Sequence, residues 1–588
     1  MGFDVKKIHD PKFFKENCMA AHSDHVTYKN EAEAVEQNSS FRLSLDGIWK
    51  FHYAKNDAQT IPGFEAEDYN CRPWDDIRVP AHIQMEWYDI PQYANIQYPW
   101  DGREDVWRDA VPTDFNPVAS YVKYFTLPEG FVKNGLYISF QGVESGFALW
   151  LNGSYVGYSE DSFTPSEFDL TPYVKEGENK LALKVFKWTS SSWCEDQDFY
   201  RFSGIFRSVY LYTMPKVHVY DLKVQPVVAE SLESADLVLD MQICGKAETV
   251  EKSADDAKMQ NVSAKITLTG SRDDSKEGAA GSVSENTIFS ETISFQPNNT
   301  SDTIRFTDTG AATVHFEQEV NHPNLWSAEH PELYTLTVEL LDESGNCVEY
   351  ISQNIGFRRF EMKDGIMTLN GKRIVFKGVN RHEFSSKTGR AVSKEEVLQD
   401  IITMKQNNIN ELCDRYGLYM IAENNLESHG SWDAASHGLV PKDTIVPGDN
   451  MDWEPMMLDR VNSCYQRDKN HPAILIWSVG NESYGGKVIF DMAEKFRAVD
   501  PHRLVHYEGI FNDRRYEGTS DMESQMYTSV ENIKKFLAEH KEKPFICCEY
   551  THAMGNSCGA MHKYTDLTDT EPRYQGGFIW DYIDQSIL

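Results

Sequence analysis

The stretch AILIWSVGNES (473–483) decides the fold of this chain. Its apolar, β-prone residues predict a buried strand that ends abruptly at Asn481 and Glu482. In barrels of alternating strands and helices, the catalytic groups lie just beyond the carboxyl ends of the strands. A second stretch, PFICCEY (544–550), repeats the pattern and ends in Glu549. One such glutamate alone would be a solvated loop residue, but two favour the paired carboxylates that cleave a glycosidic bond.

Strand and helix alternate through residues 358–588, which predicts a (β/α)8 TIM barrel. The first helix is expected to begin after Ser393, because Glu396 completes a capping box. Seven strands can be found, namely RIVFKGVN (373–380), LYMIAENN (418–425), AILIWSVG (473–480), LVHYEG (504–509), SQMYTS (524–529), PFICCEY (544–550) and GGFIWDY (576–582).

One barrel strand has no counterpart in this pattern. The first predicted helix ends at Asn410, and the next residues, ELCDRYG (411–417), are again helical in character. A parallel barrel needs a strand at that point, so we expect the barrel of this sequence to be incomplete. The sequence also stops at Leu588, directly after the last strand. We interpret both features as pieces left out of this sequence rather than as a defective barrel.

The chain before the barrel reads as β-structure. Residues 1–40 are polar and predict an extended arm. Residues 41–213 contain short alternating stretches separated by turn residues, with a hairpin signal at Asn152-Gly153. This pattern predicts a jelly-roll-like β-sandwich.

A second β region, residues 214–357, alternates equally cleanly and has the length of one immunoglobulin-like β-sandwich. Two stretches rich in Ser, Ala, Gly, Asp and Lys interrupt it, at 245–261 and 271–285. We expect them to be long surface loops and not a binding site.

Composition narrows the partners and the compartment. A formal net charge of −34 argues against nucleic acid and membrane partners. Ten scattered cysteines without CxxC spacing, and an N-terminus without the apolar core of a signal peptide, predict a cytoplasmic protein. Thirteen Trp and 29 Tyr suit the apolar faces of sugar rings, although β-sandwiches are often rich in aromatic residues as well.

Long motifs are spread over residues 43–588. They are QYPWDGRE (97–104), GYSEDSFTPSEFDLT (157–171), EDQDFYRFSGIFR (195–207), KGVNRHE (377–383), CDRYGLYMIAENNLESHG (413–430), RDKNHPAILIWSVGNES (467–483), CEYTHAMGNS (548–557) and GGFIWDYIDQS (576–586). With them the chain resembles the large bacterial β-galactosidases of glycoside hydrolase family 2. The resemblance implies a homo-oligomeric, retaining hydrolase of terminal β-D-galactose in lactose-like β-galactosides, with transgalactosylation.

The resemblance implies roles for the residues at the strand ends. Glu482 matches the general acid/base, and Glu549 matches the nucleophile that forms a covalent galactosyl intermediate. Retention requires the two carboxyl groups to lie roughly 5–5.5 Å apart. Asn481 matches the residue that hydrogen-bonds the sugar 2-hydroxyl, and turning the chain after the strand would be its alternative role.

The resemblance also implies two cations. Glu427 and His429, in LESHG, match a magnesium site together with Glu482. Without the resemblance, Glu-x-His would be an ordinary solvated loop. Asp198 matches a residue that holds the sugar 6-hydroxyl together with a sodium ion.

Further substrate contacts follow from the same resemblance. Asn95, from the first sandwich, matches a residue that reaches into the pocket, and Tyr527 matches a tyrosine beside the nucleophile. His382 and His552 match histidines that bind sugar hydroxyls, and Trp580 matches the aromatic floor under the galactose. Taken singly, such residues at strand ends would more often serve packing.

The chain departs from the family in two places. The family has an Arg-x-Ser-His-Tyr-Pro strand between NNIN and LCDRYG, and nothing corresponds to it here. That strand would supply the second barrel strand and another sugar-binding histidine. The two C-terminal β domains of the family also lie outside this sequence, with some sodium contacts and much of the tetramer surface.

Two other functions remain open. One is a family 2 β-glucuronidase or β-mannosidase. The sequence shows no extra basic pair that would bind a uronic acid carboxylate, and this argues against the glucuronidase. The other is a non-catalytic carbohydrate-binding or assembly protein on a broken barrel. The paired carboxylates argue against this second function, and the absent strand argues for it.

Overall fold

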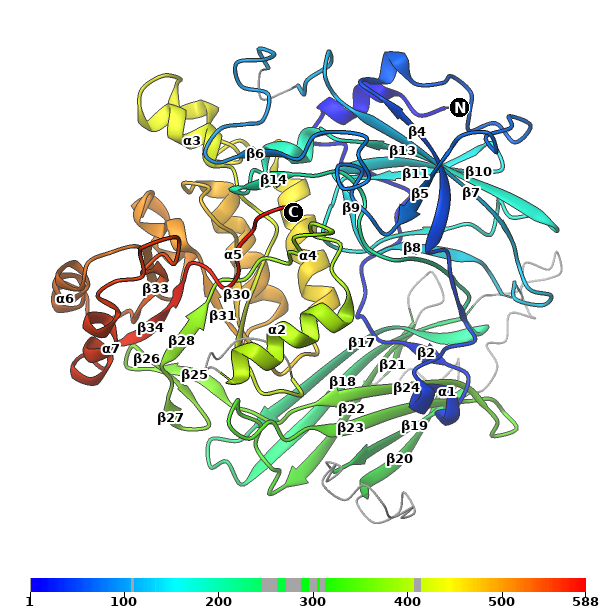
Figure 1. The fold of residues 1–588 in the computed structure, drawn as a ribbon. Coiled ribbons are helices and arrows are strands. Elements are labelled where there is room, and N and C mark those ends of the chain that lie inside the picture. The colour runs from blue at the N-terminus through cyan, green and yellow to red at the C-terminus, as the bar shows by residue number, and fades with distance from the viewer. Residues whose placement is uncertain are drawn as a thin grey trace.

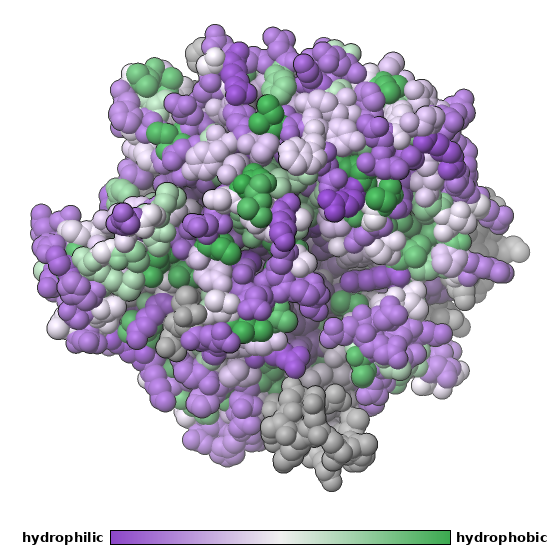
Figure 2. Space-filling model, viewed as in Figure 1, coloured by the Kyte–Doolittle hydropathy of each residue, from purple (hydrophilic) through white to green (hydrophobic). Residues whose placement is uncertain are grey.

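The structure is a computed structural model that describes residues 2–106, 110–132, 134–245, 262–270, 287–295, 304–306, 312–406 and 414–588. Figure 1 shows two sandwiches, drawn in blue to cyan and in green, beside a yellow-to-red region in which helices surround parallel strands. Figure 2 shows hydrophilic residues over most of the visible face, as expected for a net charge of −34. None of the described helices has the length and apolar character needed to cross a membrane.

The first sandwich packs two antiparallel sheets face to face. One sheet has the order β1 (Lys15–Glu16), β11 (Ser154–Ser159), β10 (Gly146–Leu151), β13 (Glu178–Phe186), β7 (Val118–Thr126), β4 (Gly47–Ala54) and β5 (Asp75–Val79). The other has the order β12 (Ser166–Asp169), β8 (Tyr137–Phe140), β16 (Val209–Tyr212) and β3 (Arg42–Ser44). The predicted hairpin at Asn152-Gly153 is confirmed, because it joins β10 to β11 with positive φ at both residues.

Two short strand pairs at the edge of this sandwich face the barrel. They are β6 (Gln92–Ala94) with β14 (Phe199–Arg201), and β9 (Val143–Glu144) with β15 (Gly204–Ile205).

Short 3-10 helices occur in the N-terminal arm, the first sandwich and the barrel. Those of the arm and the first sandwich are η1 (Val5–His9), η2 (Asp57–Gln59) and η3 (Ser190–Trp193), and those of the barrel are η6 (Lys442–Thr444), η7 (Glu508–Phe511) and η8 (Arg514–Thr519).

The second sandwich also has two sheets. They have the orders β17 (Val217–Val228), β18 (Ser234–Gly245), β22 (Ala312–Asn321), β21 (Ile304–Phe306), and β2 (Thr27–Tyr28), β24 (Cys347–Ile355), β23 (Tyr334–Leu341), β19 (Val262–Thr269), β20 (Thr287–Phe295). Burial alternates residue by residue along β19 and β23, as expected for strands with one face on a core. The predicted surface loops at 245–261 and 271–285 lie, apart from residue 245, outside the described residues.

The N-terminal arm is ordered along both sandwiches. Its strand β1 extends the first sandwich by pairing with β11, and its strand β2 pairs with β24 of the second. A short helix, α1 (Glu31–Glu36), follows β2. The extended arm predicted from the polar sequence therefore serves as a strap between the two sandwiches (Figure 1).

All seven predicted barrel strands are present. They are β28 (Phe376–Val379), β29 (Met420–Glu423), β30 (Ile474–Ser478), β31 (Leu504–His506), β32 (Glu523–Met526), β33 (Phe545–Tyr550) and β34 (Tyr574–Ile579). The helices are α2 (Lys394–Gln406), α3 (His429–Ser436), α4 (Glu454–Asp468), α5 (Lys487–Val499), α6 (Val530–Glu539) and α7 (Met561–Thr570). The capping box is confirmed: Ser393 N donates to Glu396 at 2.8 Å, and Glu396 N donates to Ser393 Oγ at 3.2 Å.

The barrel is not closed among the described residues. Its strands form two parallel sheets, β28-β34-β33-β32 and β29-β30-β31. The expected incomplete barrel is thus confirmed, and the free edge of β29 lies where the absent second strand would pair. The predicted junction between helix and helix, residues 407–413, lies outside the described part of the chain. A small sheet, β25 (Phe360–Lys363), β26 (Ile366–Leu369) and β27 (Lys372–Arg373), precedes β28.

Gly576 sets the approach of β28 to β34. Its φ is +99°, and a Cβ there would lie 2.0 Å from the carbonyl oxygen of Phe376. We expect Gly576→Ala to lower the free energy of unfolding by more than about 3 kcal/mol, because two backbones must separate. Gly559→Ala is the control, since nothing lies within 4 Å of its Cβ position. Equal chemical denaturation midpoints for the two variants would contradict this account.

Candidate active site

The carboxyl ends of the barrel strands gather the predicted site residues. Glu482 follows β30, Glu549 lies at the end of β33, Tyr527 follows β32 and Trp580 follows β34. The Glu482 charge acts on Glu549, where it raises the pKa of the carboxyl. The two glutamates singled out from the sequence are therefore near neighbours in the fold, at the end of the barrel expected for catalysis.

Glu549 is held by Tyr527. The Tyr527 hydroxyl donates to Glu549 Oε2 at 2.5 Å, and its backbone N–H donates to the Glu549 carbonyl at 2.7 Å. Glu549 is 8% exposed, and this burial, together with the Glu482 charge, raises its pKa to about 8 against the opposing hydrogen bond from Tyr527. A positive charge near the carboxyl would return it to the ionised form.

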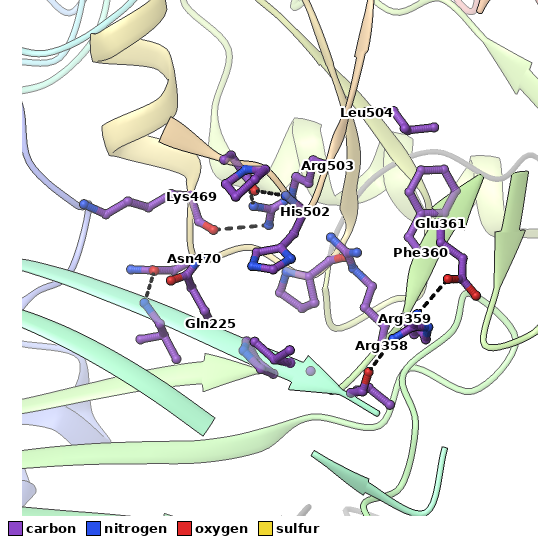
Figure 3. Close-up of a pocket in the computed structure, with 18 of the residues that line it drawn as sticks. Gln225, Arg358, Arg359, Phe360, Glu361, Lys469, Asn470, His502, Arg503 and Leu504 are labelled. Atoms are coloured by element: carbon purple, nitrogen blue, oxygen red, sulfur yellow. Dashed lines mark hydrogen bonds and ion pairs between the residues drawn. The ribbon is translucent and has the colours of Figure 1, made fainter. Parts of the chain in front are cut away.

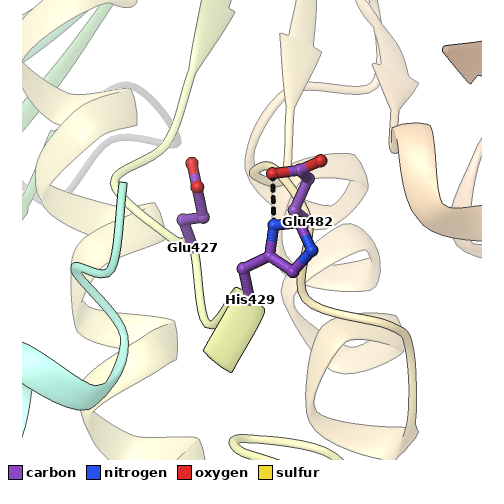
Figure 4. Close-up of side chains that lie close together, drawn as sticks. All are labelled: Glu427, His429 and Glu482. Carbon is purple, nitrogen blue, oxygen red and sulfur yellow. Dashed lines mark hydrogen bonds and ion pairs between the residues drawn. The ribbon is translucent and has the colours of Figure 1, made fainter. Parts of the chain in front are cut away.

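Glu427, His429 and Glu482 form a compact group of potential metal ligands (Figure 4). One ligand atom from each lies within 4.8 Å of the others, and His429 Nδ1 is 2.7 Å from Glu482 Oε2. Burial and the Glu482 charge raise the pKa of Glu427 well above its usual range. Burial acts to lower the pKa of His429, but the Glu482 hydrogen bond and charge outweigh it and raise the pKa.

This group fits a hard divalent cation. Carboxylate oxygens with one imidazole are ligands that magnesium and manganese accept. Two carboxylates this close repel each other, and a cation between them would remove that repulsion. Asp198 is not part of the compact group. Its backbone N–H donates to Glu427 Oε1 at 3.1 Å, so it borders the group through the main chain.

The first sandwich fastens the segment that carries Glu427. Glu195 and Glu427 form a parallel β-bridge. Glu427 N donates to the Cys194 carbonyl at 2.9 Å, and Asp196 N donates to the Glu427 carbonyl at 2.9 Å. The Asp196 carboxylate also accepts from Gly430 N at 3.0 Å, at the start of the helix that carries His429. The potential metal ligands are therefore positioned by another domain.

Two buried ion pairs support this junction. Arg460 of α4 is 2.7 Å from Glu195, and their side chains are 2% and 5% exposed. Arg201 is 2.6 Å from Asp196, with side chains 6% and 0% exposed. Burial raises the pKa values of Glu195 and Asp196 to about 7 each, against the effect of their arginines. Arg460 Nη1 also donates to the Asn425 carbonyl at 2.8 Å.

Asp198 and Asn95 bring the edge of the first sandwich to the same place. The Asp198 carboxylate accepts a short hydrogen bond from the hydroxyl of Tyr93 in β6, and the Asn95 side chain bonds the same hydroxyl. Strand β6 pairs with β14, which directly follows Asp198. The sequence placed both residues in the pocket by resemblance, and the fold brings them together through Tyr93, which the sequence did not single out.

Asn481, His382, Trp580 and His552 are the remaining predicted residues. Asn481 Nδ2 donates to Glu427 Oε2 at 3.0 Å, and the His382 ring lies edge-on to Trp580, with ring centroids 5.3 Å apart. Burial and nearby arginines lower the pKa of His382 to about 3, so its ring is neutral. His552 lies near the nucleophile candidate, because its ring centroid is 6.0 Å from that of Tyr527, which is bonded to Glu549.

A cavity of about 390 Å³ lies against these residues. Of the predicted residues, it is lined by His382, Glu427, Asn481, Glu549 and Trp580. The other predicted residues do not line it and are linked to its wall only through the contacts just described: Asn95, Asp198, His429, Glu482, Tyr527 and His552. The cavity also extends to Met420 and Ile421 of β29. Among the described residues, this strand pairs with β30 along one edge and is unpaired along the other.

The sequence reasoning missed Glu508 and His506. Glu508 follows β31, is 4% exposed, and its Oε1 has no hydrogen-bond partner among the described residues. Burial and the charges of Glu482 and Glu549 raise its pKa well above the usual range. His506 lies between Ser478 Oγ at 3.0 Å and Ser524 Oγ at 2.8 Å, across the barrel interior. The rule applied to the other glutamates, a carboxylate at a strand end, would have found Glu508.

Comparison with known proteins places this site in a family. Residues 42–215 match the sugar binding domain of glycosyl hydrolases family 2, residues 217–358 match a further domain of that family, and residues 360–588 match its TIM barrel domain. The chain is also 39% identical to the β-galactosidase large subunit of Latilactobacillus sakei, over 100% of this chain and 91% of that protein. The chain belongs to glycosyl hydrolases family 2.

Other family 2 relatives are longer than this chain. It is 48% identical to a β-galactosidase of Halalkalibacterium halodurans over 100% of this chain and 55% of that protein, and 44% identical to one of Clostridium acetobutylicum over 99% and 62%. The chain thus spans about half to three fifths of their length. A β-glucuronidase of Bifidobacterium dentium, at 18% identity, superposes with a TM-score of 0.69 over 94% of this chain and 93% of that one. That likeness confirms the fold class alone.

The Arg460–Glu195 pair offers a test of the junction in this family 2 chain. Arg460→Met leaves a buried carboxylate without its partner, so we expect the free energy of unfolding to fall by about 3–5 kcal/mol. The matched control is Arg78→Met, which breaks an exposed pair with Glu86 and should stay within about 1 kcal/mol of wild type. Similar denaturation curves for the two variants would show that the buried pair does not hold the domains together.

Proposed function

We propose that this chain carries the active site of a retaining β-galactosidase. It would release terminal β-D-galactose from β-galactosides such as lactose and transfer galactosyl groups to sugar acceptors. The observation that carries the proposal is the pair Glu482 and Glu549, which follow β30 and end β33, with the Glu482 charge acting on Glu549 and Glu549 lining the cavity. The proposal is supported by relatives described as β-galactosidases, which are 38–48% identical to this chain over its whole length.

The geometry around Glu549 suits a nucleophile. Because Tyr527 donates to Oε2, Oε1 is the oxygen left to attack the anomeric carbon. As that bond forms, the glycosidic C–O bond breaks and Glu482 gives its proton to the leaving oxygen. Glu482 then takes a proton from water, whose oxygen attacks the anomeric carbon and releases Glu549. The β-configuration is restored by the two inversions.

The sugar would be held by residues from both domains. Trp580, with His382 edge-on beside it, offers an apolar face and a neutral imidazole to the galactose ring. Asn481 is assigned to the 2-hydroxyl, and His552 to a hydroxyl near Tyr527. Asp198 would bind the 6-hydroxyl, and Asn95 would reach into the pocket from the same edge of the first sandwich.

The cavity favours a neutral sugar over a uronic acid. Its wall carries arginines, but each has a carboxylate partner: Arg207 with Glu383 at 2.9 Å, Arg381 with Asp400 at 2.7 Å, Arg390 with Glu144 at 3.4 Å, and Arg467 with Asp468 at 2.7 Å. A glucuronide carboxylate would need a cation that is not already neutralised. Among the described lining residues we find no such cation.

We assign magnesium to Glu427, His429 and Glu482, and a sodium ion to Asp198. When bound, a divalent cation would supply positive charge that tunes the acidity of Glu482. The residues themselves fix its place, because Glu427 is anchored to the first sandwich and hydrogen-bonded by Asn481. We further propose a cytoplasmic homo-oligomer: the scattered cysteines without CxxC spacing support the compartment, and the resemblance to the large bacterial β-galactosidases supports the oligomer.

Glu549 can be tested as the nucleophile by labelling. A 2-fluoro galactoside should form a stable ester with Glu549, which peptide mass spectrometry would locate. Glu549→Gln should lower kcat/KM for nitrophenyl β-galactoside by more than about 10³-fold while the melting temperature stays near that of wild type. A label on any other residue would overturn the assignment.

The cation assignment predicts a response to chelation. EDTA should slow turnover, and magnesium should restore it. Glu427→Gln should weaken magnesium binding at least about tenfold by calorimetry, because one anionic ligand is lost. Glu539→Gln, on the exposed face of α6, should bind like wild type. Unchanged affinity in Glu427→Gln would remove this residue from the ligand set.

A further inference from the structure

A second cavity lies at the opposite end of the barrel strands. It has a volume of about 360 Å³ and lies between strand β17 of the second sandwich and the segments that precede β30 and β31 (Figure 3). Gly356 and residues 358–362, which run into strand β25 of the small sheet, form another wall. Because the proposed active site lies beyond the carboxyl ends of the strands, this cavity is separate from it.

The walls of this cavity are strongly basic in a chain of net charge −34. The basic residues that line it are Lys223, Arg358, Arg359, Lys469, His502 and Arg503. Only two acidic residues, Glu361 and Asp500, line it. A local excess of this sign in an acidic protein concentrates anions from solution.

Three of the basic residues are already neutralised. The pairs are Arg503 with Asp500 at 2.6 Å, Lys469 with Asp221 at 2.6 Å, and Arg359 with Glu361 at 2.8 Å. Arg358 and Lys223 form no ion pair with any described residue. The cavity therefore holds two basic side chains without a direct ion pair in the described part of the chain, although the charges of Asp500 and Asp414 act on Arg358 from farther away.

Arg358 is fixed in place by the backbone. Its Nε donates to the Pro472 carbonyl and its Nη2 to the Ile474 carbonyl, each at 2.5 Å. The third nitrogen, Nη1, has no hydrogen-bond partner among the described residues. Burial and the neighbouring charge of Arg503 lower the pKa of Arg358 to about 9. Its guanidinium is therefore oriented by backbone carbonyls, and the charges of Asp500 and Asp414 offset only part of the cost of burying it. A bound anion would reduce that cost further.

Lys223 and Arg359 add unused donors. Within the described part of the chain, the single hydrogen bond of the Lys223 ammonium goes to the Val499 carbonyl, at 3.5 Å. Arg359 Nε is buried and has no hydrogen-bond partner, although Arg359 Nη1 and Nη2 are both bonded. Buried polar groups are normally satisfied, so an orphaned guanidinium nitrogen on a cavity wall points to an absent acceptor.

We propose that this cavity binds a small phosphate-bearing anion through Arg358 and Lys223, with Arg359 and His502 completing the site. A planar guanidinium and an ammonium are the groups with which proteins recognise phosphate oxygens. The volume accommodates the phosphate together with a small organic group such as a hexose. The bound anion would join the second sandwich to the barrel, because Lys223 lies on β17 and Arg358 is hydrogen-bonded to the carbonyls before and in β30.

Binding can be measured by calorimetry and thermal shift with inorganic phosphate and with a hexose phosphate, at constant ionic strength set by chloride. We expect saturable binding and a rise in melting temperature. Lys223→Gln and Arg358→Gln should each weaken binding at least tenfold. Lys534→Gln, which removes one exposed positive charge on α6, should leave it unchanged.

The two ligands separate the sources of the anion. Equal affinities would mean that the phosphate group alone is recognised, and tighter binding of the hexose phosphate would add contacts to the sugar; both support the site. If Arg358→Gln fails to fold, Lys223→Gln decides, since its side chain makes only one weak contact. Absence of saturable binding, or equal affinity in Lys223→Gln and Lys534→Gln, would overturn the proposal.

Discussion

The candidate active site depends on the backbone bridge between Glu195 and Glu427. Through it the first sandwich and the barrel share two main-chain hydrogen bonds of 2.9 Å, and the buried pair Arg460–Glu195 lies beside them. A carboxylate on a loop alone would move with that loop. Here Glu427 is fixed by the segment 194–196 of another domain, and His429 is fixed through the Asp196–Gly430 contact. The sandwich is therefore part of the site, and not only a support for it.

Like charges are crowded around the cavity. The Glu482 charge acts on Glu427, Glu508 and Glu549, and burial together with this repulsion raises the pKa values of these three carboxyl groups. Such an arrangement destabilises the folded chain unless positive charge enters. A divalent cation at the Glu427 group and the positive character that develops on a sugar ring during glycosidic cleavage would both supply it. The repulsion that destabilises the empty site would therefore favour binding of a cation and formation of positive charge on the sugar ring.

Local patterns predicted most of the fold, and contacts distant in sequence did not follow from them. The strand ends at Glu482 and Glu549, the capping box at Ser393 and the hairpin at Asn152-Gly153 depend on residues a few positions apart, so the sequence shows them. Other contacts depend on how the domains pack. Residue 195 pairs with residue 427, and Arg358 donates to the carbonyls before and in β30. Likeness to a family supplied Asn95 and Asp198, but not Tyr93, which brings them together. Domain boundaries and residue roles stay predictions.

Among the described residues, β29 has one unpaired edge, and the parallel strands of the barrel form two separate sheets. The carboxylate pair belongs to β30 and β33, one in each sheet, so its geometry depends on how the two sheets face each other. The most direct test is the anomeric form of the first galactose released, followed by proton NMR before mutarotation. Retention through Glu549 predicts that β-galactose appears first and α-galactose only later. The α-anomer appearing first would contradict the paired roles of Glu482 and Glu549.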